Sequence, residues 1–75
     1  MTLQQMKQRL RDFDPQAKIE VIDLTGTSNH WEVSMQSALF KGLSRIEQHK
    51  SVMACFDSEL KTGEVHALSI KTQSL

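Results

Sequence analysis

Residues 30–37 read HWEVSMQS, and this stretch decides the fold. Its apolar residues Trp31, Val33 and Met35 alternate with polar ones, a period of two that is typical of a strand with one buried and one solvated face. Upstream, residues 18–24 read KIEVIDL and are rich in β-branched side chains, which predicts another strand. Only the turn-forming residues 25–29, TGTSN, separate the two strands, so we expect an antiparallel hairpin.

A helix is predicted on the N-terminal side of this hairpin, over residues 2–12. Thr2 is a suitable N-cap, and Asp14-Pro15 ends the helix because the residue before a proline avoids helical angles. Apolar residues spaced three or four apart form one stripe along this helix: Leu3, Met6, Leu10 and Phe13.

On the C-terminal side, residues 38–41 predict a single helical turn that ends at Gly42. Ser44 and Glu47 have the spacing of a capping box, which opens a helix that we expect to run to about residue 61. Thr62-Gly63 supplies the stop. The apolar face expected for this helix comprises Ile46, Met53, Phe56 and Leu60, with Val52 beside it.

Residues 65–71, VHALSIK, predict a third strand. The element order is then α-β-β-(short α)-α-β. We expect a small α+β domain over residues 1–75, in which the helices cover one face of a three-stranded sheet.

The composition excludes several functional classes. Nine Lys and Arg residues balance nine Asp and Glu residues, which argues against a dedicated electrostatic binder of nucleic acid or membrane. One cysteine forms no internal disulfide, and this favours a reducing compartment. No apolar stretch is long enough to span a membrane and no apolar run opens the sequence, so we expect a cytoplasmic protein without a membrane partner.

Four residues could carry chemistry, namely His30, His49, His66 and Cys55. His66 is either a half-buried histidine whose ring nitrogen meets a backbone carbonyl, or a metal ligand; by period two it shares a face with Leu68 and Ile70. His30 is either an exposed polar residue or a ligand, and it points opposite to Trp31. If the strands that begin near His30 and His66 are neighbours, both rings lie at one end of the sheet.

The other two candidates favour structural roles. His49 lies three residues after Ile46 and four before Met53, so we expect a hydrogen-bonded packing histidine on the apolar stripe. Cys55 is expected to be a small buried hydrophobe with no lowered pKa.

Enzymatic chemistry has no support in the sequence. It contains no metal motif of the two-Cys, two-His kind, no nucleophile elbow and no glycine-rich phosphate loop, and 75 residues leave little room for a water-excluding pocket. We therefore expect no catalytic residue.

The number of possible ligands also limits the metal chemistry of this chain. An iron–sulfur cluster needs about four protein-type ligands, mostly thiolates. This chain could only lend one or two imidazoles to a cluster that another molecule mainly holds.

Three separate motifs resemble the BolA family. They are residues 40–44, FKGLS; residues 48–52, QHKSV; and residues 65–70, VHALSI, while residues 29–33, NHWEV, resemble the family's Ser-His-Phe start of the second strand. The resemblance covers residues 18–72 and implies a KH-like α+β domain. Gln48-His49 replaces the family's usual Arg-His pair. The short loop over residues 25–29 lacks the Gly-Gly-Cys or Gly-Gly-His of some branches and is similar to the IbaG branch.

The resemblance implies a function together with a monothiol glutaredoxin. The two proteins would share a [2Fe-2S] cluster, ligated by glutaredoxin cysteine and glutathione on one side and by BolA imidazole on the other, for iron–sulfur trafficking or for iron or redox sensing. His66 matches the family's C-terminal histidine, while His30 stands in a different register from the loop ligand of long-loop members. The isolated chain would hold no cluster.

The alternative function, also attributed to BolA proteins, is DNA-binding transcriptional regulation through the KH-like fold. A KH domain clamps the nucleic-acid backbone with a Gly-x-x-Gly loop, which this sequence lacks. Lys41, Arg45 and Lys50 could contact phosphates, although Glu47 lies among them. We expect at most weak, salt-sensitive DNA binding.

Overall fold

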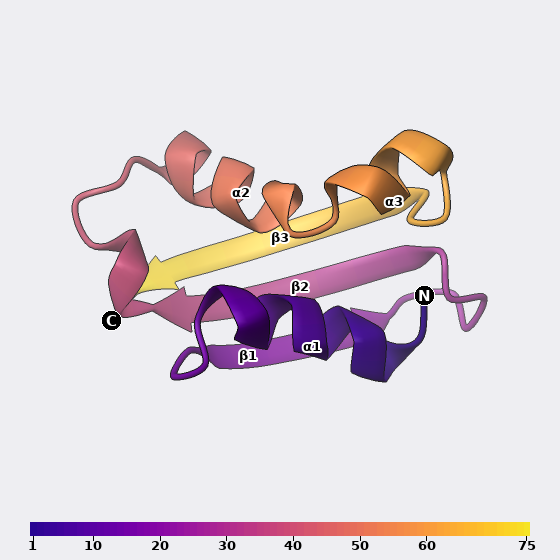
Figure 1. Ribbon diagram of the computed structural model, residues 1–75, viewed down its shortest axis with the longest axis horizontal. Helices are drawn as coiled ribbons and strands as arrows, with labels where there is room; N and C mark the ends of the chain where they lie inside the picture. Colours follow the sequence, from indigo (N-terminus) through magenta and orange to yellow (C-terminus); the bar gives the residue numbers. More distant parts are fainter.

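A three-stranded mixed sheet organises the structure, a computed structural model that describes residues 1–75 (Figure 1). The strand order is β1-β2-β3, with β1 and β2 antiparallel and β2 and β3 parallel. The elements follow the expected order, except that two helices stand where one was expected: α1 (Leu3–Phe13), β1 (Lys18–Asp23), β2 (His30–Ser37), the 3-10 helix η1 (Ala38–Phe40), α2 (Arg45–Ala54), α3 (Asp57–Thr62) and β3 (Ala67–Ser74).

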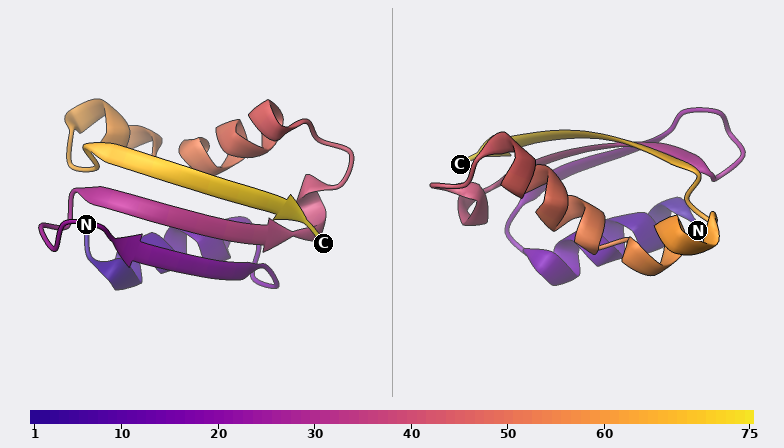
Figure 2. Two further views of the ribbon diagram at one scale, coloured as in Figure 1. Left: turned by 180° about the vertical axis from the view of Figure 1, so that it is seen from behind. Right: turned by 90° about the horizontal axis from the view of Figure 1, so that it is seen from above.

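The helices cover one face of the sheet and leave the other bare, which confirms the predicted architecture (Figure 2). The alternation along β2 is the reason, because every second residue from Trp31 to Ser37 is buried and the intervening residues are only partly covered. Trp31, Val33 and Met35 therefore lie between sheet and helices, as predicted. The burial of these side chains under α1 and α2 stabilises the domain through the apolar area removed from water.

Helix α1 is fixed by its cap and by its apolar stripe. Thr2 and Gln5 form a reciprocal capping box, in which the Thr2 hydroxyl accepts from the Gln5 N–H at 3.1 Å and the Gln5 amide oxygen accepts from the Thr2 N–H at 2.8 Å. In the middle of the stripe, Met6 and Leu10 are completely buried. No helix of the chain has the length and apolar character needed to cross a membrane.

The prediction of one helix over residues 44–61 is wrong at its middle. Helix α2 ends at Ala54, and α3 starts at Asp57. The N–H groups of Cys55 and Phe56 bond to the carbonyls three residues earlier, so the last turn tightens. Phe56 leaves the helical angles, with φ −122° and ψ 22°, and its side chain is completely buried. The chain breaks where this ring enters the core.

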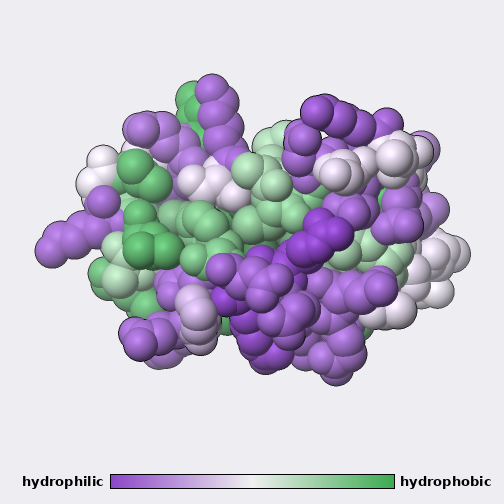
Figure 3. Space-filling model, viewed as in Figure 1, coloured by the Kyte–Doolittle hydropathy of each residue, from purple (hydrophilic) through white to green (hydrophobic).

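The face of α2 that contacts the core also differs from the prediction. Ile46 is 69% exposed and Met53 is 46% exposed, whereas Val52 is completely buried. The buried face of α2 is therefore rotated away from Ile46 and Met53. This rotation is possible because α2 ends at Ala54, so one helical face does not have to cover the core along the whole predicted length. The helix-side surface keeps an apolar band between α1 and α2 (Figure 3).

Candidate functional site

The parallel pairing of β2 and β3 brings His30 and His66 together at one end of the sheet. His30 is the first residue of β2 and lies opposite Ala67, the first residue of β3. His66 immediately precedes Ala67. The centroids of the two imidazole rings are 5.5 Å apart, with an interplanar angle of 51°. The sequence predicted both rings at one end of the sheet if the two strands are neighbours. The strands β2 and β3 are neighbours, so this prediction is confirmed.

His66 is held by its main chain rather than by its ring. Its N–H donates to the main-chain oxygen of Asn29 at 2.7 Å, and the N–H of Ala67 donates to the same oxygen at 3.2 Å. The His66 side chain is exposed, whereas Leu68 and Ile70 are half-buried. The reading of His66 as a half-buried histidine on the face of these two residues is therefore wrong, because β3 begins only at Ala67. An exposed ring on a fixed backbone is accessible to a partner.

His30 is half-buried and its ring has a hydrogen-bond partner within the chain. Its Nδ1 lies 2.7 Å from Oδ1 of the preceding residue, Asn29. The sequence pattern indicates only a turn at Asn29 and does not predict this contact. The sequence does place an amide side chain directly before a candidate ligand. This adjacency predicts a contact only when the conformation of the loop is known.

The loop before His30 is fixed by the carboxylate of Asp23. Its two oxygens accept from the N–H groups of Gly26 and Ser28, each at 3.0 Å. The indole Nε1 of the buried Trp31 donates to the Ser28 carbonyl at 3.1 Å. Ser28 has φ 62°, a left-handed conformation that is uncommon for a residue with a side chain. His30 thus directly follows a constrained loop, and the main chain of His66 is bonded to the last residue of that loop, Asn29.

The remaining candidates lie elsewhere. Cys55 is half-buried at the break between α2 and α3, and this burial raises the pKa of its thiol above the ordinary value, against the opposing charge of Arg9. His49 is half-buried in a depression between α2 and β3 that Arg45 and Ile70 also line. Since Ile46 and Met53 are exposed, the expectation that His49 lies on a buried apolar stripe is wrong.

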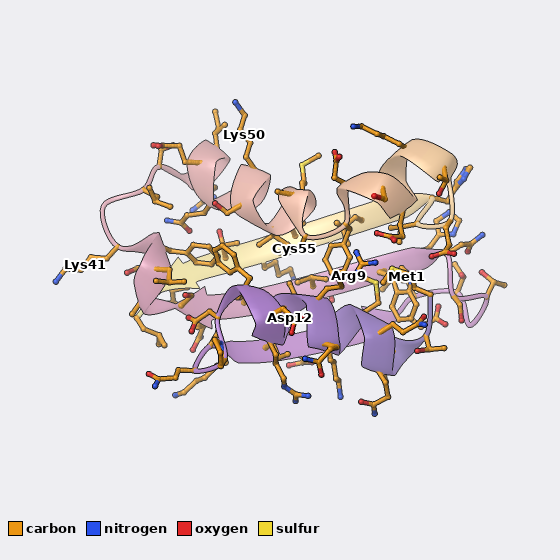
Figure 4. The ribbon with its side chains drawn as sticks, viewed as in Figure 1. Met1, Arg9, Asp12, Lys41, Lys50 and Cys55 are labelled. Carbon is orange, nitrogen blue, oxygen red and sulfur yellow. The ribbon has the colours of Figure 1, made fainter.

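The three basic residues of the alternative function do not form one patch. Lys41 follows η1, whereas Arg45 and Lys50 belong to α2. The side chains of Lys41 and Lys50 extend from the molecule in different directions (Figure 4). Glu47 lies among them, and hydrogen bonds from the Ser44 backbone and hydroxyl hold the pKa of its carboxyl below the ordinary value. A negative charge therefore interrupts the basic side chains.

No group of three or more His, Cys, Asp or Glu side chains lies close enough together to hold a metal ion. The histidine pair is thus a partial donor set. Two neutral imidazoles can supply two ligand nitrogens, and any further ligands would have to come from another molecule.

Comparisons with known proteins identify relatives of the whole chain. A family model described as BolA-like protein matches residues 7–75. The Rickettsia prowazekii protein RP812 is 33% identical over 75 residues, 100% of this chain and 96% of that protein, and its NMR structure gives a TM-score of 0.72. BolA1 from Arabidopsis thaliana and the BolA domain of SufE1 from the same plant each give a TM-score of 0.84 at 25% identity, covering 95% of this chain and 88% of theirs.

Proposed function

Because the chain belongs to the BolA-like protein family, we propose that it is a partner of a monothiol glutaredoxin, with which it shares a [2Fe-2S] cluster. His66 is the principal ligand that this chain contributes, and His30 is the secondary one. The observation that carries the proposal is the pair of imidazole rings, 5.5 Å apart at one end of the sheet. The cluster is cargo or a sensed group in this function, passed on or monitored by the complex.

The donor set of the chain fits such sharing. Iron–sulfur clusters are held mainly by thiolates, and histidine can replace cysteine on one iron. The single thiol, Cys55, is half-buried in the helical layer, so the ligands that this chain can offer are the two imidazoles. Glutaredoxin cysteine and glutathione would supply the thiolates. A cluster with imidazole ligands has a higher reduction potential than one with thiolates alone, which suits transfer or sensing.

The different environments of the two histidines explain their ranking. His66 is exposed, and its backbone is anchored to Asn29, so its ring reaches a partner without a change in the fold. His30 is half-buried and already makes one ring hydrogen bond, so it offers fewer approaches. A ligand imidazole must be neutral, and acid therefore weakens the complex as protons compete for the ring nitrogens.

Co-expression with the host's monothiol glutaredoxin, followed by visible circular dichroism of the purified complex, tests the function. We expect a heterodimer with a mixed-ligand cluster spectrum. His66→Ala should keep the fold but change the spectrum and speed cluster loss, and His30→Ala should do the same more weakly. His49→Ala is the matched histidine control and should lower only thermal stability.

Two results would contradict the proposal. The first is that co-purification and titration calorimetry both detect no binding, with and without the cluster. This result would contradict the partnership with glutaredoxin. An unchanged cluster spectrum in His66→Ala, with the complex still formed, would remove His66 as a ligand. The spectrum would then have to be explained by His30 or by a solvent ligand.

The alternative function, DNA-binding regulation, has one structural observation in its favour. None of Lys41, Arg45 and Lys50 takes part in an ion pair within the chain, so their charges are free to contact phosphates. Their separation from the histidine pair makes the two functions experimentally distinguishable.

A further inference from the structure

Asn29 contacts both histidines of the pair through different groups. Its side-chain Oδ1 lies 2.7 Å from the ring Nδ1 of His30. Its main-chain oxygen accepts from the N–H of His66 at 2.7 Å. One residue in the loop between β1 and β2 therefore touches the ring of one candidate ligand and the backbone of the other.

The contact with the His30 ring determines which nitrogen carries the proton. An amide oxygen has lone pairs and no hydrogen, so the ring Nδ1 must be the donor in this bond. A neutral imidazole has one N–H, and its other nitrogen keeps a lone pair. Nδ1–H therefore leaves Nε2 of His30 unprotonated and able to act as a ligand.

The orientation of the Asn29 amide is itself supported by the loop. The Thr27 hydroxyl donates to the same Oδ1, and the Thr25 and Thr27 hydroxyls lie 2.6 Å apart. The Asp23 carboxylate holds the main chain of Gly26 and Ser28. In the structure the Asn29 oxygen, rather than its amide nitrogen, faces both the Thr27 hydroxyl and the His30 ring.

We propose that Asn29 is a positioning residue that holds His30 in the Nδ1–H form and so leaves Nε2 of that ring unprotonated and able to act as a ligand. This step rests on the proposed function for its purpose, since ligand histidines commonly donate their other ring N–H to an oxygen that fixes the tautomer. The tautomer itself can be measured on the protein alone.

The test is long-range proton–nitrogen correlation NMR on the ¹⁵N-labelled protein without cluster or partner. The spectra are recorded at about pH 8, above the pKa of about 6.5 of an ordinary histidine side chain. We expect the wild-type His30 signals of an Nδ1–H ring. In Asn29→Ala the acceptor is lost, and we expect a shift toward the Nε2–H form that free imidazole side chains favour in water.

Two further variants separate positioning from a general effect on the loop. Asn29→Asp keeps an acceptor oxygen and should restore the Nδ1–H signals. Ser28→Ala changes the same loop but removes only a 3.4 Å contact with Asp23, so it should leave the tautomer of His30 unchanged. The main-chain oxygen of residue 29 persists in every variant, so the His66 backbone stays anchored and the fold should be retained.

The outcomes distinguish this inference from the proposed function. In the glutaredoxin complex, Asn29→Ala should reproduce the spectral change of His30→Ala, and Asn29→Asp should reverse it. An Nε2–H ring in the wild type, or the same tautomer in wild type and Asn29→Ala, would overturn the positioning role while leaving the partnership intact. If the tautomer shifts as expected but no variant or wild-type protein binds glutaredoxin, the partnership fails and the positioning of the ring stands.

Discussion

Arg9 shows how much of this fold depends on one side chain. Its guanidinium donates to the Cys55 carbonyl at 2.9 Å and forms a two-pronged pair with Glu59, with N···O distances of 2.7 and 2.8 Å (Figure 4). It therefore joins α1 to the break between α2 and α3, where a helix end leaves carbonyls without partners. Arg9→Ala should lower the free energy of unfolding by about 1 kcal/mol for the lost bond to Cys55. Urea denaturation measures this effect, and Arg11→Ala is the control because Arg11 is exposed on the same helix.

The same contact makes a prediction for acid. The hydrogen bond from Arg9 holds the pKa of the Glu59 carboxyl below its ordinary value of 4.5. Glu59 is thus harder to protonate in the folded state, so its contribution to stability is complete above pH 4.5 and is lost as the pH falls through the lower folded pKa. Stability should therefore fall more steeply below this pH in the wild type than in Arg9→Ala. Parallel acid curves for the two proteins would show that the pair does not contribute.

At the scale of elements, local signals were predictable and distant ones were not. Helix ends can be predicted from residues that are close in the sequence. The structure has all three predicted ends, at Thr2, Ser44 and Gly63. The break after Ala54 has no proline or glycine to announce it. It depends on the burial of Phe56 and on a bond from Arg9, 46 residues away in the chain. A single helix was therefore the reasonable but wrong prediction.

Gly63 tests how strictly the connection from α3 to β3 is defined. It ends α3 with φ 83° and ψ 4°, and a Cβ added there would meet no atom within 4 Å. The cost of Gly63→Ala is therefore backbone strain alone, about 1–2 kcal/mol. Gly63→Asn should cost less, because asparagine tolerates the left-handed conformation. Urea denaturation of both variants measures the order, and equal stability of Gly63→Ala and wild type would mean that the helix end relaxes at no cost.

For the molecule as a whole, topology made the histidine pair predictable in outline. His30 begins β2 and His66 immediately precedes β3, and two parallel strands begin at the same end of the sheet. The parallel pairing requires a long crossover, which η1, α2 and α3 provide. Asn29 could not be predicted in the same way. Its contacts arise from the loop conformation around Ser28, which the sequence pattern TGTSN does not specify beyond a turn.

The same topology places the two candidate functions at different parts of the molecule. The histidines lie where β2 and β3 begin, while Lys41 follows the end of β2 at the opposite end of the long axis (Figure 4). The double variant Lys41→Ala and Arg45→Ala should therefore leave the cluster spectrum of the glutaredoxin complex unchanged. Fluorescence anisotropy with labelled duplex DNA should show at most weak binding that falls with added salt and falls further in this variant, because only phosphate contacts are available.

His66→Ala is the reciprocal control, and it should change the cluster spectrum without changing DNA binding. Tight, sequence-specific DNA binding at physiological salt that disappears in the double variant would place the regulatory function first. If either variant changed the cluster spectrum and also lost DNA binding, the glutaredoxin and DNA would use one surface. This result would contradict the separation of the histidines from the basic residues in the structure. Independent effects of the two variants would instead assign the cluster function to the strand starts, where Asn29 bonds to the ring of His30 and to the main chain of His66.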